Sequence, residues 1–391
     1  MPFHGVDYFA LDELLTDEER LVRDTFRRLV DDELMPIAAR HFRDGTFPRD
    51  LLPRRLGELG ALGATLQGYG CAGLGPVAYG LIMQELERCD SGFRSFASVQ
   101  GSLVMYPVHA FGSEEQKQRW LPALAAGEAI GCFGLTEPDF GSNPAGMRTT
   151  ARRAAGGWVL SGEKRWITSG GLADFAVVWA RTDEEGQPVR GFLVERGTPG
   201  YSTRDIHGKF SLRASVTSEL IFEDCAIPES AMLPGVKGLK GPLSCLNQAR
   251  FGIAWGAIGA AMACYDEALQ YTKERVQFAR PIAGYQLVQQ KLVDMLEDLT
   301  SAQLIAWRLG RLKEQGAARP QQVSFAKRHN VRIALHAART ARELLGASGI
   351  TDEYQCGRHL CNLESVYTYE GTDHVHTLII GQDITGLSAF E

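Results

Sequence analysis

The arrangement of helical and strand patterns along the chain limits the possible folds more than any other feature. Up to about residue 128, apolar residues recur at helical spacing, and a capping box of Thr16 and Glu19 opens the first such stretch. Between residues 129 and 240 the pattern changes to short β-branched and aromatic runs bounded by Gly, Ser, Asp or Pro, which predicts antiparallel strands. After residue 240, apolar residues again recur at helical spacing. Because strands and helices do not alternate, a doubly wound parallel sheet is disfavoured and an α+β chain of several domains is predicted.

We therefore predict three domains. They are an N-terminal helical domain (1–128), a middle antiparallel β domain (129–240) and a C-terminal four-helix domain (241–391). With 391 residues, 45% of them hydrophobic, the chain can bury a sizeable core. The C-terminal helices are expected at roughly 242–274, 282–315, 320–346 and 362–380.

Charge and hydropathy argue against several kinds of partner. The formal charge of −6 is spread along the chain without a long basic run, so binding to nucleic acid or to an anionic membrane surface is not expected. The longest uncharged apolar stretch, Phe251 to Tyr265, is shorter than the roughly 20 residues that a membrane span needs. We interpret it as a buried helix that packs closely through Gly252, Gly256 and Gly259.

The cysteines and the first residues indicate a reducing compartment. None of the eight cysteines forms a C-x-x-C pair, which favours free thiols. The opening MPFHGVDYFALDELL is acidic and has neither a signal-peptide nor a transit-peptide pattern. A cytoplasmic protein is predicted, or a mitochondrial matrix protein if a transit peptide has been removed.

Three motifs that suggest ligand sites are weak. GYGCAG (68–73) matches a dinucleotide-binding fingerprint, but it follows a helical pattern rather than a strand, so a loop between helices is predicted. No G-x-S-x-G nucleophile elbow is present. The Cys and His residues of the segments CGRHLC and DHVH lack the spacing of a zinc site, so no metal site is predicted there. These residues are Cys356, His359, Cys361, His374 and His376.

Glu370 is the strongest candidate for a catalytic group. It is a lone carboxylate that follows Tyr369, precedes a tight Gly-Thr turn and is followed by the apolar run Val375 to Ile380. Burial raises the pKa of a carboxyl, so this setting suits a general base that acts near neutral pH. The loop Cys132 to Met147, at the join of the helical and β regions, is either an interdomain linker or the lining of a ligand cleft.

Four segments together resemble signatures of the acyl-CoA dehydrogenase family. GLTEPDFGSN (134–143) and ELLGASGITDEYQCGRHLCN (343–362) are similar to its two signature motifs, RWITSG (165–170) to its flavin-contacting strand, and YEGT (369–372) to its catalytic turn. The segments ERCDSGFRSFASVQGSLVM, KFSLRASVTSELI and CLNQARFGIAWG resemble the glutaryl-CoA dehydrogenase branch of that family. The resemblance implies the three-domain acyl-CoA dehydrogenase fold, bound FAD and a homotetramer.

The resemblance also assigns residues to FAD. The isoalloxazine ring would lie against the first signature and the RWITSG strand, and the pyrophosphate near Glu343 to Ala347. Arg275 and Gln286 would reach FAD from a neighbouring subunit. The complete set of FAD-binding candidates is Phe133, Leu135, Thr136, Gly141, Ser142, Trp166, Thr168, Arg275, Phe278, Gln286, Glu343, Leu344, Leu345, Gly346, Ala347, Thr372 and Phe390.

Substrate contacts are implied in the same way. Glu370 would remove the α-proton, while its backbone N–H and a flavin ribityl hydroxyl would donate to the thioester oxygen. Some family members carry the base on another helix, but the stretch Ala231 to Tyr265 contains no Asp or Glu. The implied acyl-CoA-binding residues are Glu87, Arg94, Ser95, Ser142, Leu243, Asn247, Arg250, Tyr369 and Gly371.

Arg94 bears on the choice of acyl group. It follows Glu87 by seven residues, so the two side chains potentially lie on one helical face. An ion pair between them at the surface would contribute little to the stability of the fold. The planar fork of Arg94 also suits the far carboxylate of a dicarboxylic acyl chain, which is the role that the glutaryl-CoA branch gives to the matching arginine. The predicted reaction is oxidation of glutaryl-CoA with loss of CO₂ to give crotonyl-CoA, with an electron-transferring flavoprotein as the partner.

Departures from the family pattern leave other functions open. The segment TDHVH inverts the more common His-Asp order of the branch. The alternatives are a short-chain acyl-CoA or acyl-carrier-protein dehydrogenase without decarboxylation, a flavin oxidase or monooxygenase, and a flavin-free scaffold. Four further positions differ from the residue that the family prefers. Phe140 stands in place of a small residue, Asn143 in place of Asp, Ser169 in place of Asn and Ala347 in place of Gly.

Overall fold

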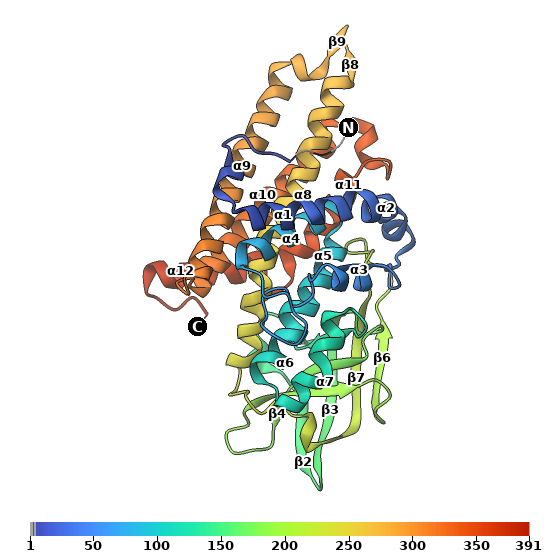
Figure 1. Cartoon of the computed structure of the whole chain (residues 1–391), viewed down its shortest axis with the longest axis vertical. Helices are drawn as coiled ribbons and strands as arrows, with labels where there is room; N and C mark the ends of the chain where they lie inside the picture. Colours follow the sequence, from blue (N-terminus) through green and yellow to red (C-terminus); the bar gives the residue numbers. More distant parts are fainter. Residues whose placement is uncertain (1–2, 4, 391) are drawn as a thin grey trace.

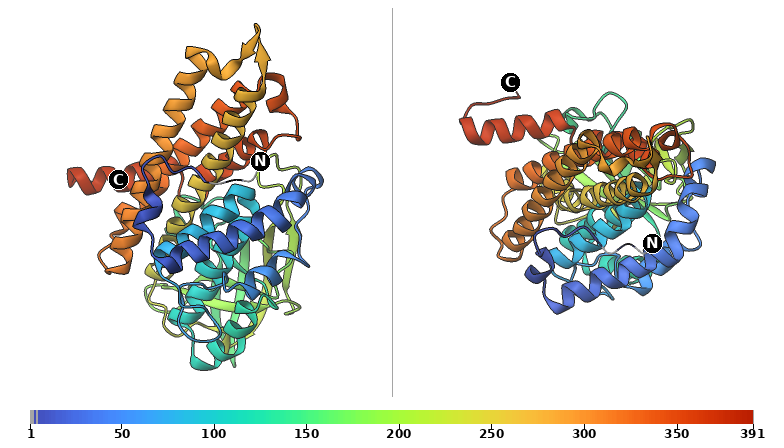
Figure 2. Two further views of the ribbon diagram at one scale, coloured as in Figure 1. Left: turned by 45° about the horizontal axis from the view of Figure 1, so that its top comes forward. Right: turned by 90° about the horizontal axis from the view of Figure 1, so that it is seen from above.

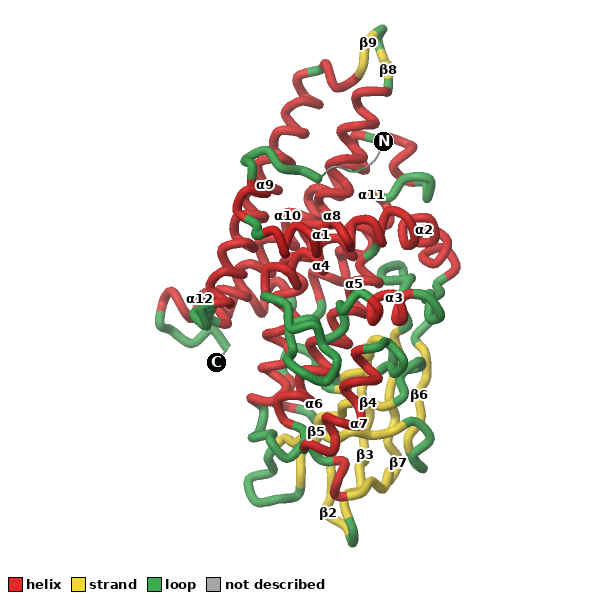
Figure 3. The backbone as a smooth tube through the Cα atoms, in the orientation of Figure 1, coloured by secondary structure: helices red, strands yellow, loops and turns green. Residues whose placement is uncertain are grey.

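The computed structural model describes residues 3 and 5–390. The molecule is elongated, with a helical bundle at one end of its long axis and a sheet at the other (Figure 1). The N-terminal helices cross between the two, and the predicted order of helices, strands and helices is confirmed (Figure 3). The N-terminal elements are η1 (Leu11–Leu14), α1 (Asp17–Leu29), η2 (Val30–Leu34), α2 (Met35–Asp44), α3 (Leu52–Glu58), α4 (Pro76–Cys89), α5 (Ser91–Ser98), η3 (Val99–Met105), α6 (Tyr106–Phe111) and α7 (Glu114–Ala125).

Two local expectations in this part are confirmed. Thr16 Oγ1 accepts from the Glu19 N–H at 3.2 Å, and the Glu19 carboxylate accepts from the Thr16 N–H at 2.8 Å, which completes the capping box of α1. The glycine-rich segment 68–73 lies in the loop between α3 and α4. It follows a helix rather than a strand, so it lacks the structural context of a dinucleotide-binding turn.

The sheet is mixed rather than purely antiparallel. In the described residues it has seven strands, in the order β1-β4-β2-β3-β7-β6 with β5 paired to β4. The pairs β1–β4 and β2–β4 are parallel, whereas the other pairs are antiparallel. The expectation of antiparallel pairing throughout was therefore wrong, because sequence runs do not reveal which strands become neighbours. The strands are β1 (Gly131–Gly134), β2 (Thr150–Ala154), β3 (Gly157–Thr168), β4 (Phe175–Thr182), β5 (Val189–Glu195), β6 (Tyr201–Asp205) and β7 (Thr217–Pro228).

The C-terminal part forms five α-helices within the described residues. The segment 362–380, expected as one helix, is divided between α11 and α12 because the backbone reverses at Glu370 and Gly371. Figure 2 shows α12 projecting from the side of the bundle. The elements are α8 (Lys240–Glu274), β8 (Val276–Gln277), β9 (Arg280–Pro281), η6 (Ile282–Gly284), α9 (Gln286–Glu314), α10 (Pro320–Leu344), η7 (Gly346–Ile350), α11 (Cys356–Thr368) and α12 (Asp373–Thr385).

Glycines on one face of α8 allow α4 to approach unusually closely. A Cβ on Gly259 would overlap the Gln84 carbonyl, and a Cβ on Gly256 would overlap the Glu87 carboxylate, both far inside 3.0 Å. A Cβ on Gly252 would lie 2.8 Å from the Tyr79 hydroxyl. The predicted close packing through these glycines is confirmed. No helix in the described residues has the length and apolarity that would allow it to cross a bilayer.

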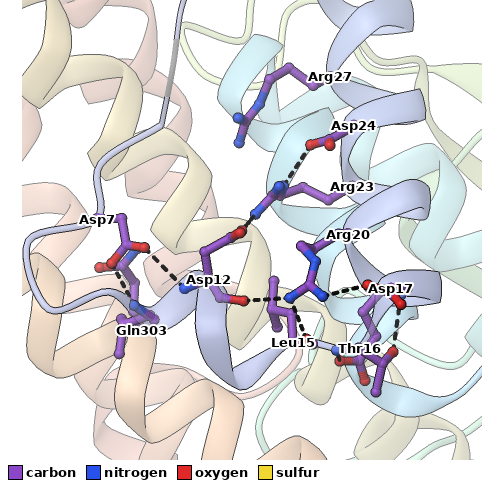
Figure 4. A network of polar contacts seen from close by, with 12 residues as sticks. Asp7, Asp12, Leu15, Thr16, Asp17, Arg20, Arg23, Asp24, Arg27 and Gln303 are labelled. Atoms are coloured by element: carbon purple, nitrogen blue, oxygen red, sulfur yellow. Dashed lines mark hydrogen bonds and ion pairs between the residues drawn. The ribbon is translucent and has the colours of Figure 1, made fainter.

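The segment before α1 is fastened across the C-terminal helices (Figure 4). The Gln303 side-chain amide of α9 donates to the Val6 carbonyl at 2.8 Å. The Asp7 carboxylate accepts from the Asp12 N–H at 3.0 Å, and Arg20 donates to the Asp12 carbonyl at 2.9 Å. These contacts hold residues 6–15 in an ordered path although they form only one short helical turn.

We predict that Gly259→Ala lowers the free energy of unfolding by at least about 1–3 kcal/mol, because the added methyl group must displace backbone atoms of α4. Gly381→Ala is the matched control. Gly381 lies inside α12 with open space around it, so alanine there stabilises by about 0.5–1 kcal/mol through helix propensity. Chemical denaturation of the two variants provides the measurement, and equal stabilities would contradict the prediction.

Candidate functional site

A short turn, Tyr369–Thr372, separates α11 from α12. Glu370 has φ of +52° and Gly371 has φ of +97°, a left-handed conformation that glutamate adopts at a cost. A Cβ on residue 371 would lie 2.9 Å from His376 Nε2, so glycine is needed there for space as well as for φ. Thr372 Oγ1 accepts from a backbone N–H at 3.1 Å and starts α12. The turn therefore places Glu370 at a fixed break between two helices.

The Glu370 carboxyl lies in a buried, electropositive setting. Its Oε2 atom is shielded from solvent and has no hydrogen-bond partner in the part of the chain that the structure describes. Burial raises the pKa of Glu370 above its ordinary value, while the positive charges of Arg94, Lys327 and Arg250 act in the opposite direction. This combination suits a group that must hold and release a proton.

Two cations from different helices bind the backbone of the turn. The Lys327 ammonium of α10 donates to the Tyr369 carbonyl at 2.9 Å and to the Gly371 carbonyl at 2.7 Å. Arg250 Nε of α8 donates to the Glu370 carbonyl at 2.7 Å. Burial lowers the pKa of Lys327 to about 7, and the negative charge of Glu370 limits that decrease. All three carbonyls of the segment 369–371 are thus bound by cations.

Arg94 is completely buried beside this turn, with 0% of its surface exposed. Its Nε donates to Glu87 Oε2 at 2.6 Å, and its Nη2 donates to the Tyr369 hydroxyl. Its Nη1 is buried and has no partner among residues 3 and 5–390. Burial disfavours the charged guanidinium, but the charge of Glu87 outweighs this effect, and the pKa of Arg94 lies above its ordinary value. A charged donor is therefore left unsatisfied close to Glu370.

Glu87 and Arg94 do not share a helical face, contrary to the expectation from their spacing. The helix α4 ends at Cys89, and Asp90, with φ of −159°, caps the separate helix α5. Asp90 also accepts from Asn362 Nδ2 of α11 at 2.9 Å. The ion pair is buried rather than superficial, because α5 turns Arg94 inward against α4 and α11.

A second group of candidates meets on the sheet. Trp166 lies at a register shift in β3 between Lys164 and Ile167, has φ of +65°, and is 55% exposed. The bulge turns this large aromatic ring outward, a common device at ligand sites. The neighbouring Arg165 N–H donates to the Thr136 carbonyl at 2.8 Å, so the loop after β1 lies against the same strand. Two predicted FAD-binding segments are therefore adjacent.

The loop after β1 keeps its shape through a buried pair that the sequence did not reveal. The Glu137 carboxylate accepts from Lys164 Nζ at 2.8 Å and from the N–H groups of Arg148 and Thr149 at 2.6 and 2.9 Å. Burial lowers the pKa of Lys164 to about 8, while Glu137 favours its charge. The loop is anchored at both ends by one carboxylate, and its tip, with Gly141 and Ser142, is exposed.

Other predicted residues are not brought into contact with the turn within this chain. Arg275 directly precedes β8, and Phe278 lies between β8 and β9, in the hairpin at the far tip of the bundle (Figure 1). Phe278 is 92% exposed. Gln286 begins α9 next to them, and Phe390 is exposed beyond α12. The remaining candidates are dispersed: Phe133, Leu135, Ser95 and Leu345 are buried; Thr168, Asn247 and Leu344 are half-buried; Leu243, Glu343, Gly346 and Ala347 are exposed.

Comparison with known proteins agrees with this architecture. Family models of the acyl-CoA dehydrogenase N-terminal, middle and C-terminal domains match residues 16–128, 132–225 and 236–385. The chain belongs to the acyl-CoA dehydrogenase family. The family recognised from the sequence motifs and its three-domain fold are both confirmed.

Three relatives illustrate the similarity. The human mitochondrial short-chain specific acyl-CoA dehydrogenase is 36% identical over 94% of this chain and 90% of its own length. A glutaryl-CoA dehydrogenase from Mycobacterium smegmatis, solved in complex with FADH₂, is 54% identical and superposes with a TM-score of 0.97 over 99% of both chains. The butyryl-CoA dehydrogenase of Megasphaera elsdenii is 31% identical, with a TM-score of 0.90 over 95% of this chain and 98% of its own.

Several site residues were missed by sequence reasoning. Lys327 lies in an ordinary amphipathic helix, 42 residues before Tyr369, and only the tertiary structure shows that it binds the turn. Asp90 accepts from the Gly92 N–H and caps α5, and it also accepts from Asn362 of α11, a contact that the sequence does not indicate. Glu137 lies in the segment GLTEPDFGSN and Lys164 directly precedes RWITSG, but the pairing of two residues from separate segments leaves no local signal in the sequence.

We predict that the pKa of Glu370 lies above 4.5, its ordinary value, because burial disfavours the carboxylate. An infrared pH titration, taken as the difference between wild type and Glu370→Gln, should show a protonated carboxyl band that disappears with a midpoint above 4.5. Since the folded state holds this proton more tightly than the unfolded state, this group's contribution to stability decreases as pH rises from the unfolded pKa through the folded one. A midpoint at or below 4.5 would contradict the prediction.

Proposed function

We propose that this protein is an FAD-dependent glutaryl-CoA dehydrogenase that oxidises glutaryl-CoA to glutaconyl-CoA and releases CO₂ to give crotonyl-CoA. The observation that carries the proposal is that Nη1 of the buried Arg94, next to the Tyr369–Glu370 turn, has no partner within residues 3 and 5–390. An N–H of a charged guanidinium loses solvation when it is buried without an acceptor. A carboxylate at the far end of the acyl chain would supply that acceptor.

The alternative short-chain substrate lacks this group. With butyryl-CoA bound, Nη1 of Arg94 would gain no acceptor, whereas glutaryl-CoA presents a carboxylate that matches a guanidinium fork. The 54% identity to a glutaryl-CoA dehydrogenase exceeds the 36% and 31% identities to the short-chain and butyryl-CoA enzymes, which also favours glutaryl-CoA.

The chain's own groups would carry the proton chemistry. Glu370 Oε2, buried and unpartnered in the described structure, would accept the proton from the α-carbon of the thioester. Arg94 would hold the distal carboxylate until the bond between that carboxyl group and the adjacent carbon breaks and CO₂ leaves. The proton held by Glu370 could then return to the remaining four-carbon chain, so that protons balance.

The sheet residues fit a flat flavin ring. Trp166 offers an exposed aromatic side chain at a strand bulge, and Thr168 ends the same strand. Thr136, on the adjoining loop, accepts from the Arg165 N–H of that strand at 2.8 Å. Bound FAD would supply the acceptor for the two electrons that leave the substrate. The electrons would then pass to an electron-transferring flavoprotein, as the family membership suggests.

A homotetramer would account for the dispersed candidates. Arg275, Phe278 and Gln286 are exposed at the tip of the bundle, where they have no role within one chain. Apolar side chains of the C-terminal helices are also exposed, which is typical of a protein interface. These side chains are Leu287, Val293, Leu304, Phe325 and Ile384.

We predict that the purified protein is yellow, contains about one FAD per chain and is a tetramer in solution, because the tip of one subunit would complete the FAD site of another. Flavin absorbance combined with light scattering gives both numbers. A colourless monomer that cannot be reconstituted with FAD would contradict the prediction and would favour the scaffold alternative. Formation of peroxide from oxygen at the rate of turnover would favour the oxidase alternative.

We further predict that wild type prefers glutaryl-CoA to butyryl-CoA and that Arg94→Gln reverses this preference. The loss of a charge-assisted pair costs about 1.5–3 kcal/mol, which corresponds to roughly 10- to 150-fold in kcat/KM for glutaryl-CoA. Butyryl-CoA turnover should decrease much less.

Arg88→Gln is the control for this experiment. Arg88 is also a buried arginine, and it donates to Glu85 Oε2 at 2.8 Å and to Asp31 Oδ1 at 2.7 Å, away from the turn. Its loss should reduce stability without changing the ratio of the two substrates. A wild-type preference for butyryl-CoA, or an equal effect of Arg94→Gln on both substrates, would refute the glutaryl assignment.

A further inference from the structure

The backbone of the Tyr369–Gly371 turn is held by cations at every carbonyl. Lys327 Nζ binds the carbonyls on both sides of Glu370, at 2.9 and 2.7 Å, and Arg250 Nε binds the carbonyl of Glu370 itself at 2.7 Å. Lys327 is 1% exposed, so both bonds lie away from competing water. A single ammonium therefore binds the carbonyls of both residues that neighbour the proposed base.

Because the peptide group is planar, the hydrogen bonds to these carbonyls also determine the direction in which the Glu370 N–H points. A trans peptide is planar, and its C=O and N–H point to opposite sides. The Tyr369 carbonyl and the Glu370 N–H belong to one peptide unit, so the bond from Lys327 to that carbonyl directs the N–H away from α10. Among the described residues this N–H donates to no backbone carbonyl. It is free to bind a ligand.

The conformation of Glu370 also needs external support. Its φ of +52° is left-handed, a region that a non-glycine residue occupies only when surrounding contacts impose it. Lys327 binds the carbonyls of Tyr369 and Gly371, the residues before and after Glu370. The lysine thus restrains both the backbone N–H and the direction in which the side chain leaves the turn.

A purely structural role for Lys327 is the simpler alternative. A buried lysine often satisfies carbonyls at the end of a helix, and Tyr369 is the C-cap of α11. However, Gly371 lies beyond that helix, and the same ammonium is buried with Arg94, Arg250, Glu370 and Asp373 as its charged neighbours. Helix capping alone explains only one of its two hydrogen bonds.

We propose that Lys327 is a positioning residue that aims the Glu370 N–H at the thioester oxygen and the Glu370 carboxylate at the α-carbon. The inference rests on the proposed function, in which Glu370 is the base. Its consequence is that loss of Lys327 impairs removal of the α-proton more than it impairs binding of acyl-CoA.

Exchange of α-protons in D₂O tests this proposal separately from electron transfer. The flavin-containing enzyme is reduced anaerobically beforehand, so that butyryl-CoA cannot be oxidised, and deuterium at its α-carbon is followed by mass spectrometry. Lys327→Met should slow exchange by about tenfold or more, since removing an oxyanion donor outright costs about 10²–10³. The dissociation constant for butyryl-CoA should stay close to that of wild type. Lys327→Arg, which keeps a charged donor, should restore part of the rate.

The control is Lys313→Met. Lys313 is a half-buried lysine, on α9, and it donates to Gln248 Oε1 at 2.6 Å without contacting the turn. This variant should exchange at the wild-type rate, and Glu370→Gln should not exchange at all. Normal exchange in Lys327→Met overturns the inference about Lys327 alone, whereas wild-type exchange by Glu370→Gln refutes the proposed base and with it the proposed function. If Lys327→Met does not retain flavin, Lys327→Arg decides: exchange slower than in wild type supports the inference, and an equal rate overturns it.

Discussion

The close approach of α4 to α8 is the constraint on which the site depends. Where α4 crosses Gly256, a Cβ would occupy the position of the Glu87 carboxylate, and the Nε of Arg94 lies only 3.1 Å from that Cβ position. The buried ion pair therefore exists because α8 has no side chain at this point. A buried guanidinium without its carboxylate would carry a large desolvation cost, so this packing also determines whether Arg94 can be charged.

The site concentrates three cations around one carboxyl group. Arg94, Arg250 and Lys327 come from three different helices and converge on Glu370 and its turn. Their charges partly offset the effect of burial, which raises the pKa of Glu370. Nε and Nη2 of Arg94, Nε of Arg250 and Nζ of Lys327 bind protein acceptors. The buried Nη1 of Arg94, which has no partner in the part of the chain that the structure describes, is the donor that the proposed function assigns to substrate. The arrangement links substrate choice and proton removal through a few shared contacts.

Several features were predictable because their signals are local. The change from helical spacing to short strands, the capping box of α1 and the glycine face of α8 depend on residues close together in sequence, and all three are present. Other features depend on which segments become neighbours. The parallel pairing of β1 with β4 and the separate helices that carry Glu87 and Arg94 could not be deduced from spacing, and both expectations were wrong.

The sequence by itself determined the family, the order of the elements and the identity of the lone carboxylate at residue 370, because motifs and periodicities are written in consecutive residues. Only the tertiary structure decided that Lys327 binds the turn and that one nitrogen of Arg94 has no partner among the described residues. Both facts arise where helices distant in sequence meet. Hydrogen bonding and burial at such a junction depend on distances of a few ångströms, which the order of residues does not encode locally.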